Sequence, residues 1–217
     1  MIDPGEVAER LEVVRARLRQ AGGEAVRVVA VTKGFGADAI EAAVSAGLHD
    51  VGESYAQEAV AKLGEADVGA NPIVHFIGGL QRNKVRRLAG VVDVWQSVDR
   101  VALVDEIARR SPGARMMVQV DISGEEAKGG CPPDEAGGLV DHAAAAGLVV
   151  EGLMGIGPVG EPAAARPGFG RLRRLVDDLG LAECSMGMTD DLEVAVGEGS
   201  TMIRVGTALF GPRPPRS

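Results

Sequence analysis

The sequence predicts a single-domain (β/α)8 TIM barrel, an α/β fold, preceded by one extra N-terminal helix. Hydrophobic runs rich in Val and Ile alternate eight times with Ala-rich segments of helical period, which is typical of repeated βα units and a parallel sheet. The 217 residues suit one such domain and are enough to bury a sizeable core. The G-x-G-x-x-G that would favour an open sheet is absent after the first run, where residues 33–37 read KGFGA. We therefore favour a closed barrel.

Each predicted strand is a short apolar run, and each predicted helix fills the gap behind it. The strands are expected at Val26–Lys33, Asp50–Ser54, Val74–Gly79, Val92–Val98, Met116–Ile122, Val149–Gly157, Cys184–Met188 and Met202–Leu209. The helices are expected at Ala37–Ala46, Tyr55–Leu63, Asn83–Ala89, Arg100–Arg110, Asp134–Ala146, Phe169–Leu179 and Asp190–Val196. Gly47 and Gly64 are the stop signals of the first two helices. The extra helix, Pro4–Gln20, lies before the first strand and is expected to plug the bottom of the barrel.

Composition sets the domain limits and excludes several classes of function. We expect a barrel domain over residues 1–211 and a flexible tail over 212–217, because the proline-rich end has nothing to pack. The formal net charge of −8 argues against nucleic acid as a partner. No apolar run approaches the ~20 residues that span a membrane, and the N-terminus lacks a signal-peptide core, so a cytoplasmic protein is expected. Cys131 and Cys184 form no C-x-x-C pair, which leaves zinc and redox sites without support.

Lys33 is the first candidate for chemistry. It ends the first predicted strand, so its stem starts among apolar neighbours and its amine points into the mouth of the barrel, where the working residues of such barrels lie. Desolvation there lowers the pKa of an amine, and only the neutral amine attacks an aldehyde to form a Schiff base. The alternative is a lysine that leaves the barrel for solvent.

The loops after the last two strands form the second candidate feature. Residues 185–191 contain Gly187, which permits close backbone approach, and the last strand leads into Gly206 and Thr207. Loops after strands seven and eight are the usual phosphate cradle of a barrel. Arg204 lies between apolar neighbours on the last strand, so it is expected to be buried and to need a partner, either a carboxylate of the barrel or an acceptor on a bound ring.

Six motifs follow one another along the chain: VAVTK, VGESYAQE, HFIGGLQRNK, QVDISGEEAKGG, EGLMGIGP and SMGMTDDLEVAVGEGSTMIRVGTALFG. In this order and spacing they resemble the motifs of the pyridoxal phosphate homeostasis protein family. The resemblance covers nearly the whole chain. It implies a barrel similar to the N-terminal domain of alanine racemase, of fold type III, that carries pyridoxal 5′-phosphate (PLP) as a lysine aldimine and has no established catalytic activity.

The resemblance also implies roles for individual residues. Lys33 falls on the aldimine lysine, and Arg204 falls on the arginine that faces the pyridine nitrogen. Four further positions fall on the two phosphate loops of the family, namely Ser185, Gly187, Gly206 and Thr207. One position departs from the usual motif, because Ser54 replaces an asparagine that is expected against the cofactor ring.

These features favour a PLP carrier or regulator over an enzyme, with PLP and PLP-dependent apoenzymes as partners and a monomeric state. The alternative is a racemase-like PLP enzyme, but racemisation needs a second acid/base group, which racemases obtain partly from an additional domain. An arginine at the pyridine nitrogen also weakens the ring as an electron sink. A Schiff-base aldolase without PLP is a third hypothesis. Lys128, in a loop on the cofactor side, is either solvated or a second amine that PLP can visit.

Overall fold

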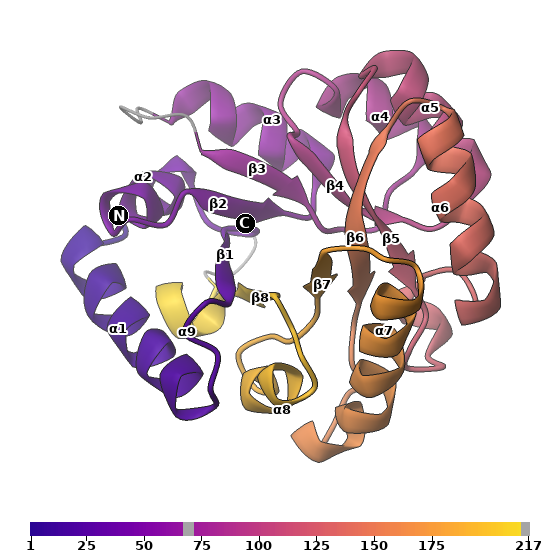
Figure 1. Ribbon diagram of the computed structural model, residues 1–217. Helices are drawn as coiled ribbons and strands as arrows, with labels where there is room; N and C mark the ends of the chain where they lie inside the picture. Colours follow the sequence, from indigo (N-terminus) through magenta and orange to yellow (C-terminus); the bar gives the residue numbers. More distant parts are fainter. Residues whose placement is uncertain (67–71, 214–217) are drawn as a thin grey trace.

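The computed structural model describes residues 1–66 and 72–213, and these form one closed barrel. The eight strands are parallel and follow the chain order, from β1 to β8. β1 pairs with β8 in register from Arg27 with Met202 to Ala30 with Val205, which closes the sheet (Figure 1). The predicted (β/α)8 barrel is confirmed.

The elements occur where the hydrophobic pattern changes. The strands are β1 Arg27–Val31, β2 Asp50–Glu53, β3 Ile73–Phe76, β4 Val94–Val98, β5 Arg115–Val120, β6 Val149–Gly155, β7 Glu183–Ser185 and β8 Met202–Val205. The α-helices are α1 Pro4–Gln20, α2 Ala37–Ser45, α3 Ala56–Glu65, α4 Arg82–Leu88, α5 Val101–Arg110, α6 Ala136–Ala145, α7 Arg166–Asp178, α8 Leu192–Gly197 and α9 Thr207–Phe210. Short 3-10 turns are η1 Glu126–Lys128, η2 Pro133–Glu135 and η3 Pro162–Ala165.

Most strands end earlier than the sequence pattern predicts. β1 ends at Val31 and β7 at Ser185, and the predicted eighth strand breaks at Gly206, after which α9 begins. The apolar runs continue beyond the sheet because residues such as Ile156 and Met188, in the loops that follow the strands, line a pocket at the barrel mouth. At these positions the apolar residues indicate contact with the pocket and do not indicate hydrogen bonding between strands.

The N-terminal helix α1 lies outside the barrel. Asp3 accepts a hydrogen bond from the backbone N–H of Gly5, which caps the helix. The buried face repeats at helical spacing and consists of Val7, Leu11, Val14 and Leu18. This face packs against α2, α8 and α9, so α1 joins the outer layer of helices (Figure 1). The expectation that it plugs the bottom of the barrel is wrong, because its apolar stripe matches the neighbouring helices.

The inside of the barrel differs from the layer around it. The core between strands and helices is a continuous apolar cluster. Within the barrel a smaller cluster contains Val29, Val94, Met117, Met154 and Met202. Further buried polar side chains share this interior, and they lead from the bottom of the barrel to its mouth. No helix in the described part of the chain is long and apolar enough to cross a membrane.

Candidate functional site

A pocket of about 180 Å3 lies at the carboxyl ends of the strands, bordered by the loops after β1, β7 and β8. These loops meet because closure of the barrel makes β1 the neighbour of β8. Four of the residues predicted from the sequence line this pocket together: Lys33, Arg204, Gly206 and Thr207. The position is the one at which barrels of this class bind ligands.

Lys33 lies two residues beyond β1, in a turn whose backbone is held from outside the barrel. The N–H of Gly34 donates to Glu58 Oε1 over 2.5 Å. Desolvation is the main cause that lowers the pKa of the Lys33 amine, and the nearby charges of Arg213 and Arg204 lower the pKa further, against an opposing effect of Glu53. Lys33 makes no hydrogen bond or ion pair to another residue within 1–66 and 72–213. The amine is therefore biased toward the neutral, nucleophilic form.

Arg204 extends from β8 into the barrel and is only 4% exposed. One terminal nitrogen donates to Ser185 O over 2.8 Å and to Ser185 Oγ over 2.7 Å, and the other donates to Gly155 O over 2.8 Å. All three acceptors are neutral, and no carboxylate of the described residues pairs with this guanidinium. Desolvation lowers the pKa of Arg204 to about 10, so the group still carries its charge at neutral pH. A buried cation thus borders the pocket beside Lys33.

The loops after β7 and β8 approach the pocket through glycines. Gly187 has a φ of +95°, which disfavours any residue with a side chain, and its carbonyl accepts a hydrogen bond from the N–H of Arg204. A Cβ on Gly187 would lie 2.5 Å from Ala195 Cβ, and one on Gly206 would lie 3.2 Å from Val31 O. Thr207 begins α9, so the first N–H groups of this helix have no acceptor within the helix.

The other predicted residues occupy different places. Ser185 is fully buried below the pocket, where its hydroxyl donates to Gln96 Oε1 and accepts from Arg204. Gly187 supports the loop behind Met188 and Thr189, which line the pocket. Ser54 follows β2, and its buried Oγ has no hydrogen-bond partner among the described residues. Ser54 and Ser185 are therefore not brought to the pocket wall with Lys33.

Arg213 and Lys128 also lie at this end of the barrel. Arg213 belongs to the tail that the sequence predicts to be flexible, yet it lines the pocket, and its Cδ would lie 3.1 Å from a Cβ on Gly34. Its proline-rich sequence context carries no signal for this placement. Residues 214–217 of the predicted tail lie outside the described part. Lys128 borders an adjoining pocket, where it donates to Gly157 O and pairs with Glu125 over 3.2 Å.

Comparison with known proteins places the whole chain in one group. The family model for the alanine racemase N-terminal domain matches residues 2–214. The chain is 42% identical to a pyridoxal phosphate homeostasis protein of Pseudomonas aeruginosa, over 95% of this chain and 96% of the relative. It is 33% identical to PipY of Synechococcus elongatus, whose solved structure has PLP bound, with a TM-score of 0.84 over 94% of this chain and all of PipY.

The same barrel also occurs in larger proteins. A lysine/ornithine decarboxylase of Vibrio vulnificus matches with a TM-score of 0.75 at 14% identity, over 98% of this chain and 64% of the decarboxylase chain. At this identity the match shows the shared fold alone.

Proposed function

The chain belongs to the pyridoxal phosphate homeostasis protein family, and on this basis we propose that it binds PLP through Lys33 as a carrier or regulator of the cofactor. The observation that carries the proposal is the pairing, in one pocket, of an amine with a lowered pKa and a buried guanidinium that has no carboxylate partner in the described part of the chain. Both groups are left available to a ligand by the protein itself.

The residues of this pocket fit such a cofactor. PLP, when bound, supplies an aldehyde that a neutral amine can attack and a phosphate that carries negative charge. Lys33 provides the amine. Arg204 provides donors toward the ring, as guanidinium cannot accept hydrogen bonds. Gly206 and Thr207 provide backbone N–H groups and a hydroxyl for the phosphate, and Gly187 holds the neighbouring loop in place.

The remaining predicted contacts belong to the same proposal. Ser54 directly follows β2, and its buried hydroxyl finds no partner among residues 1–66 and 72–213, so we assign it to the side of the cofactor ring. Ser185 lies beneath the pocket and acts on the ligand through Arg204 or through its backbone. Lys128, in the adjoining pocket, is assigned no role in the primary site.

A role without turnover is supported by the relatives, which are described as homeostasis proteins. The racemase-like alternative needs a second acid/base group opposite Lys33. The single tyrosine of the chain, Tyr55, lines a different pocket, beside basic residues of α4. We further propose that the protein is a cytoplasmic monomer that supplies PLP to apoenzymes and binds neither nucleic acid nor membrane.

The test is a titration of the purified protein with PLP, followed by borohydride and peptide mapping by mass. We expect a yellow protein whose colour is bleached by borohydride and a pyridoxyl label on the peptide that contains Lys33. A label on Lys128 or Lys84 would contradict the assignment of Lys33. A protein that forms a Schiff base with sugar phosphates and never with PLP would favour the aldolase hypothesis.

A parallel assay tests the absence of catalysis. We expect no appreciable racemisation or decarboxylation of common amino acids by the PLP-loaded protein. Turnover on the order of 1 s⁻¹, within the range of ordinary enzymes, would favour the racemase-like alternative.

A further inference from the structure

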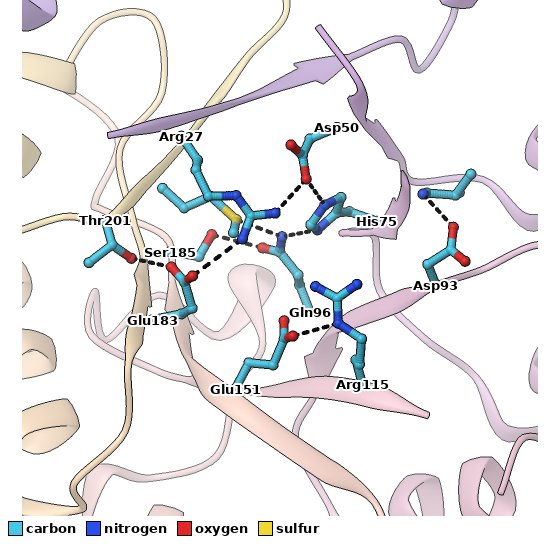
Figure 2. Close-up of polar contacts among 12 residues, drawn as sticks. Arg27, Asp50, His75, Asp93, Gln96, Arg115, Glu151, Glu183, Ser185 and Thr201 are labelled. Atoms are coloured by element: carbon cyan, nitrogen blue, oxygen red, sulfur yellow. Dashed lines mark hydrogen bonds and ion pairs between the residues drawn. The ribbon is translucent and has the colours of Figure 1, made fainter. Parts of the chain in front are cut away.

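A chain of hydrogen bonds crosses the interior of the barrel from the pocket to its opposite end. Arg204 donates to Ser185 Oγ over 2.7 Å, and Ser185 donates to Gln96 Oε1 over 2.7 Å. Gln96 Nε2 lies 2.7 Å from His75 Nδ1, and His75 Nε2 lies 2.8 Å from Asp50 Oδ1. Figure 2 shows the part from Ser185 to Asp50. Five strands, β8, β7, β4, β3 and β2, each contribute one member of this interior chain.

The chemistry of its members gives every bond in the interior chain one direction. Gln96 directs its amide nitrogen to His75 Nδ1 and to Met202 Sδ, and its amide oxygen to Ser185. An amide nitrogen only donates, so His75 Nδ1 accepts and the ring proton lies on Nε2, facing the Asp50 carboxylate. The Ser185 hydroxyl then donates its single proton to Gln96 Oε1. A lone pair of Ser185 Oγ remains for Arg204.

Both ends of the interior chain are charged and its middle is sealed from water. Its three middle members, His75, Gln96 and Ser185, are each 0% exposed. At the lower end Asp50 also binds Arg27 over 2.5 Å, and Arg27 reaches Glu183 over 3.2 Å (Figure 2). Hydrogen bonds in such a low-dielectric row polarise one another. The interior chain therefore runs from the Arg204 cation at the pocket to the Asp50 carboxylate, which is held in place by Arg27.

We propose that His75 and Gln96 are positioning residues that fix the guanidinium of Arg204 toward the pocket through Ser185. The inference rests on the proposed function and deepens it, because it adds an oriented side-chain acceptor for a buried arginine that pairs with no carboxylate among the described residues. Without Gln96, the Ser185 hydroxyl proton would lose its acceptor and the hydroxyl would be free to turn. The guanidinium would keep Ser185 O and Gly155 O but lose the fixed bond to Ser185 Oγ.

The same strand β4 offers a matched control. Ser97, next to Gln96, is 2% exposed, and its Oγ has no hydrogen-bond partner in the described residues. It lies in the part of β4 where the register with β5 shifts, between Trp95 and Val98, and it is no member of the interior chain. Loss of its hydroxyl removes a buried polar group from the same strand and leaves the interior chain intact.

The experiment compares Gln96→Leu with Ser97→Ala. We expect Gln96→Leu to weaken PLP binding about tenfold, the effect of losing one oriented hydrogen bond to a charged group. Ser97→Ala is expected to keep the wild-type affinity. The absorbance band of bound PLP should also shift in Gln96→Leu and stay in place in Ser97→Ala. Circular dichroism checks that both variants fold. A folded Gln96→Leu with wild-type affinity and an unshifted band would overturn the proposal.

Two substitutions of His75 keep the test valid if Gln96→Leu does not fold. His75→Asn retains an acceptor close to the position of Nδ1, whereas His75→Leu retains none. We expect His75→Asn to bind PLP more tightly than His75→Leu. Equal affinities for these two variants would mean that the acceptor facing Gln96 has no influence on the site.

A measurement without PLP separates this inference from the proposed function. Nitrogen NMR of the protein alone should show His75 with a protonated Nε2 and a bare Nδ1. The guanidinium signals of Arg204, assigned by their loss in Arg204→Lys, should exchange slowly with water in the wild type and faster in Gln96→Leu. A wild-type protein that does not bind PLP would refute the proposed function. Unchanged exchange in Gln96→Leu would refute the positioning role in either case.

Discussion

Two regions of the protein bury a cation, and they treat its charge in opposite ways. Between β2 and α3, Lys62 is 5% exposed and its Nζ lies 2.5 Å from Glu53 and 2.8 Å from Glu58, with Thr32 O as a third partner. At the barrel mouth, Arg204 is 4% exposed, yet within the described residues its hydrogen bonds go only to neutral oxygens. The outer cluster neutralises its lysine locally, while the inner site leaves a positive charge beside Lys33.

The difference separates a charge that serves the fold from one that serves a ligand. Burying an ion is costly unless it is paired, so a fully paired lysine indicates structural use. Arg204 lacks that compensation, and desolvation lowers its pKa to about 10. At every pH below about 10 the fold carries a guanidinium that it disfavours relative to the unfolded chain. An anionic, hydrogen-bonding ligand would supply the missing partner.

The largest difference is expected between replacements of Lys33, which should affect PLP binding, and of Lys62, which should affect stability. Lys33→Ala should lose all borohydride labelling and the visible absorbance of bound PLP, because the amine is removed. It should retain weaker, non-covalent binding, since Arg204, Gly206 and Thr207 remain. Absorbance and mass measurements check this. Persistence of the full visible band in Lys33→Ala would show that another amine carries the cofactor.

Lys62→Met should mainly affect stability. Removing the cation leaves Glu53 buried and unpaired, which typically costs about 3–5 kcal/mol. Burial already raises the pKa of Glu53. A raised pKa means that folding favours the protonated carboxyl, so the destabilisation should grow as pH rises and shrink in acid. Urea unfolding at two pH values measures it. The PLP label should stay on Lys33. A label on another lysine would show that Lys62 also influences the PLP site.

Arg204→Met should separate binding from stability. We expect PLP affinity to fall by roughly 10- to 100-fold, as charged hydrogen bonds contribute about 1.5–3 kcal/mol. The protein without PLP should unfold at the same temperature or higher, because an apolar side chain replaces an uncompensated charge. Calorimetry of the PLP-free protein and a PLP titration decide the matter. A large loss of stability of PLP-free Arg204→Met would mean that Arg204, like Lys62, mainly stabilises the fold.

The smallest expected effect concerns Arg213. This exposed arginine is the second cause, after desolvation, of the lowered pKa of Lys33. Arg213→Ala should raise the pKa of Lys33, so that a smaller fraction of the amine is neutral near neutral pH. Carbon NMR of reductively methylated lysines follows this titration. High salt should reproduce part of the shift in the wild type, because screening weakens exposed charges. An unchanged pKa of Lys33 in Arg213→Ala would show that the charge of Arg213 does not act on this amine.

Much of the fold could be predicted from the sequence, because local patterns encode it. The eight Val- and Ile-rich runs predict eight strands, and burial on both faces of a parallel sheet makes those runs continuous. The position of Lys33 at the end of the first run predicts its place at the mouth. The ends of β7 and β8 could not be read in this way, since Met188 lines the pocket at the barrel mouth and Leu209 is buried in α9, both outside the sheet.

The sequence by itself determined the barrel, the candidate amine and the glycine loops, since strand period and backbone requirements are local properties of the chain. Only the tertiary structure decided which buried cation is paired. Lys62 meets Glu53 across β2 and α3, Arg204 meets Ser185 across two strands, and Arg213 returns to Gly34 from the far end of the chain. These pairings depend on barrel closure, which brings residues distant in sequence within hydrogen-bonding distance, and no local pattern records such distances.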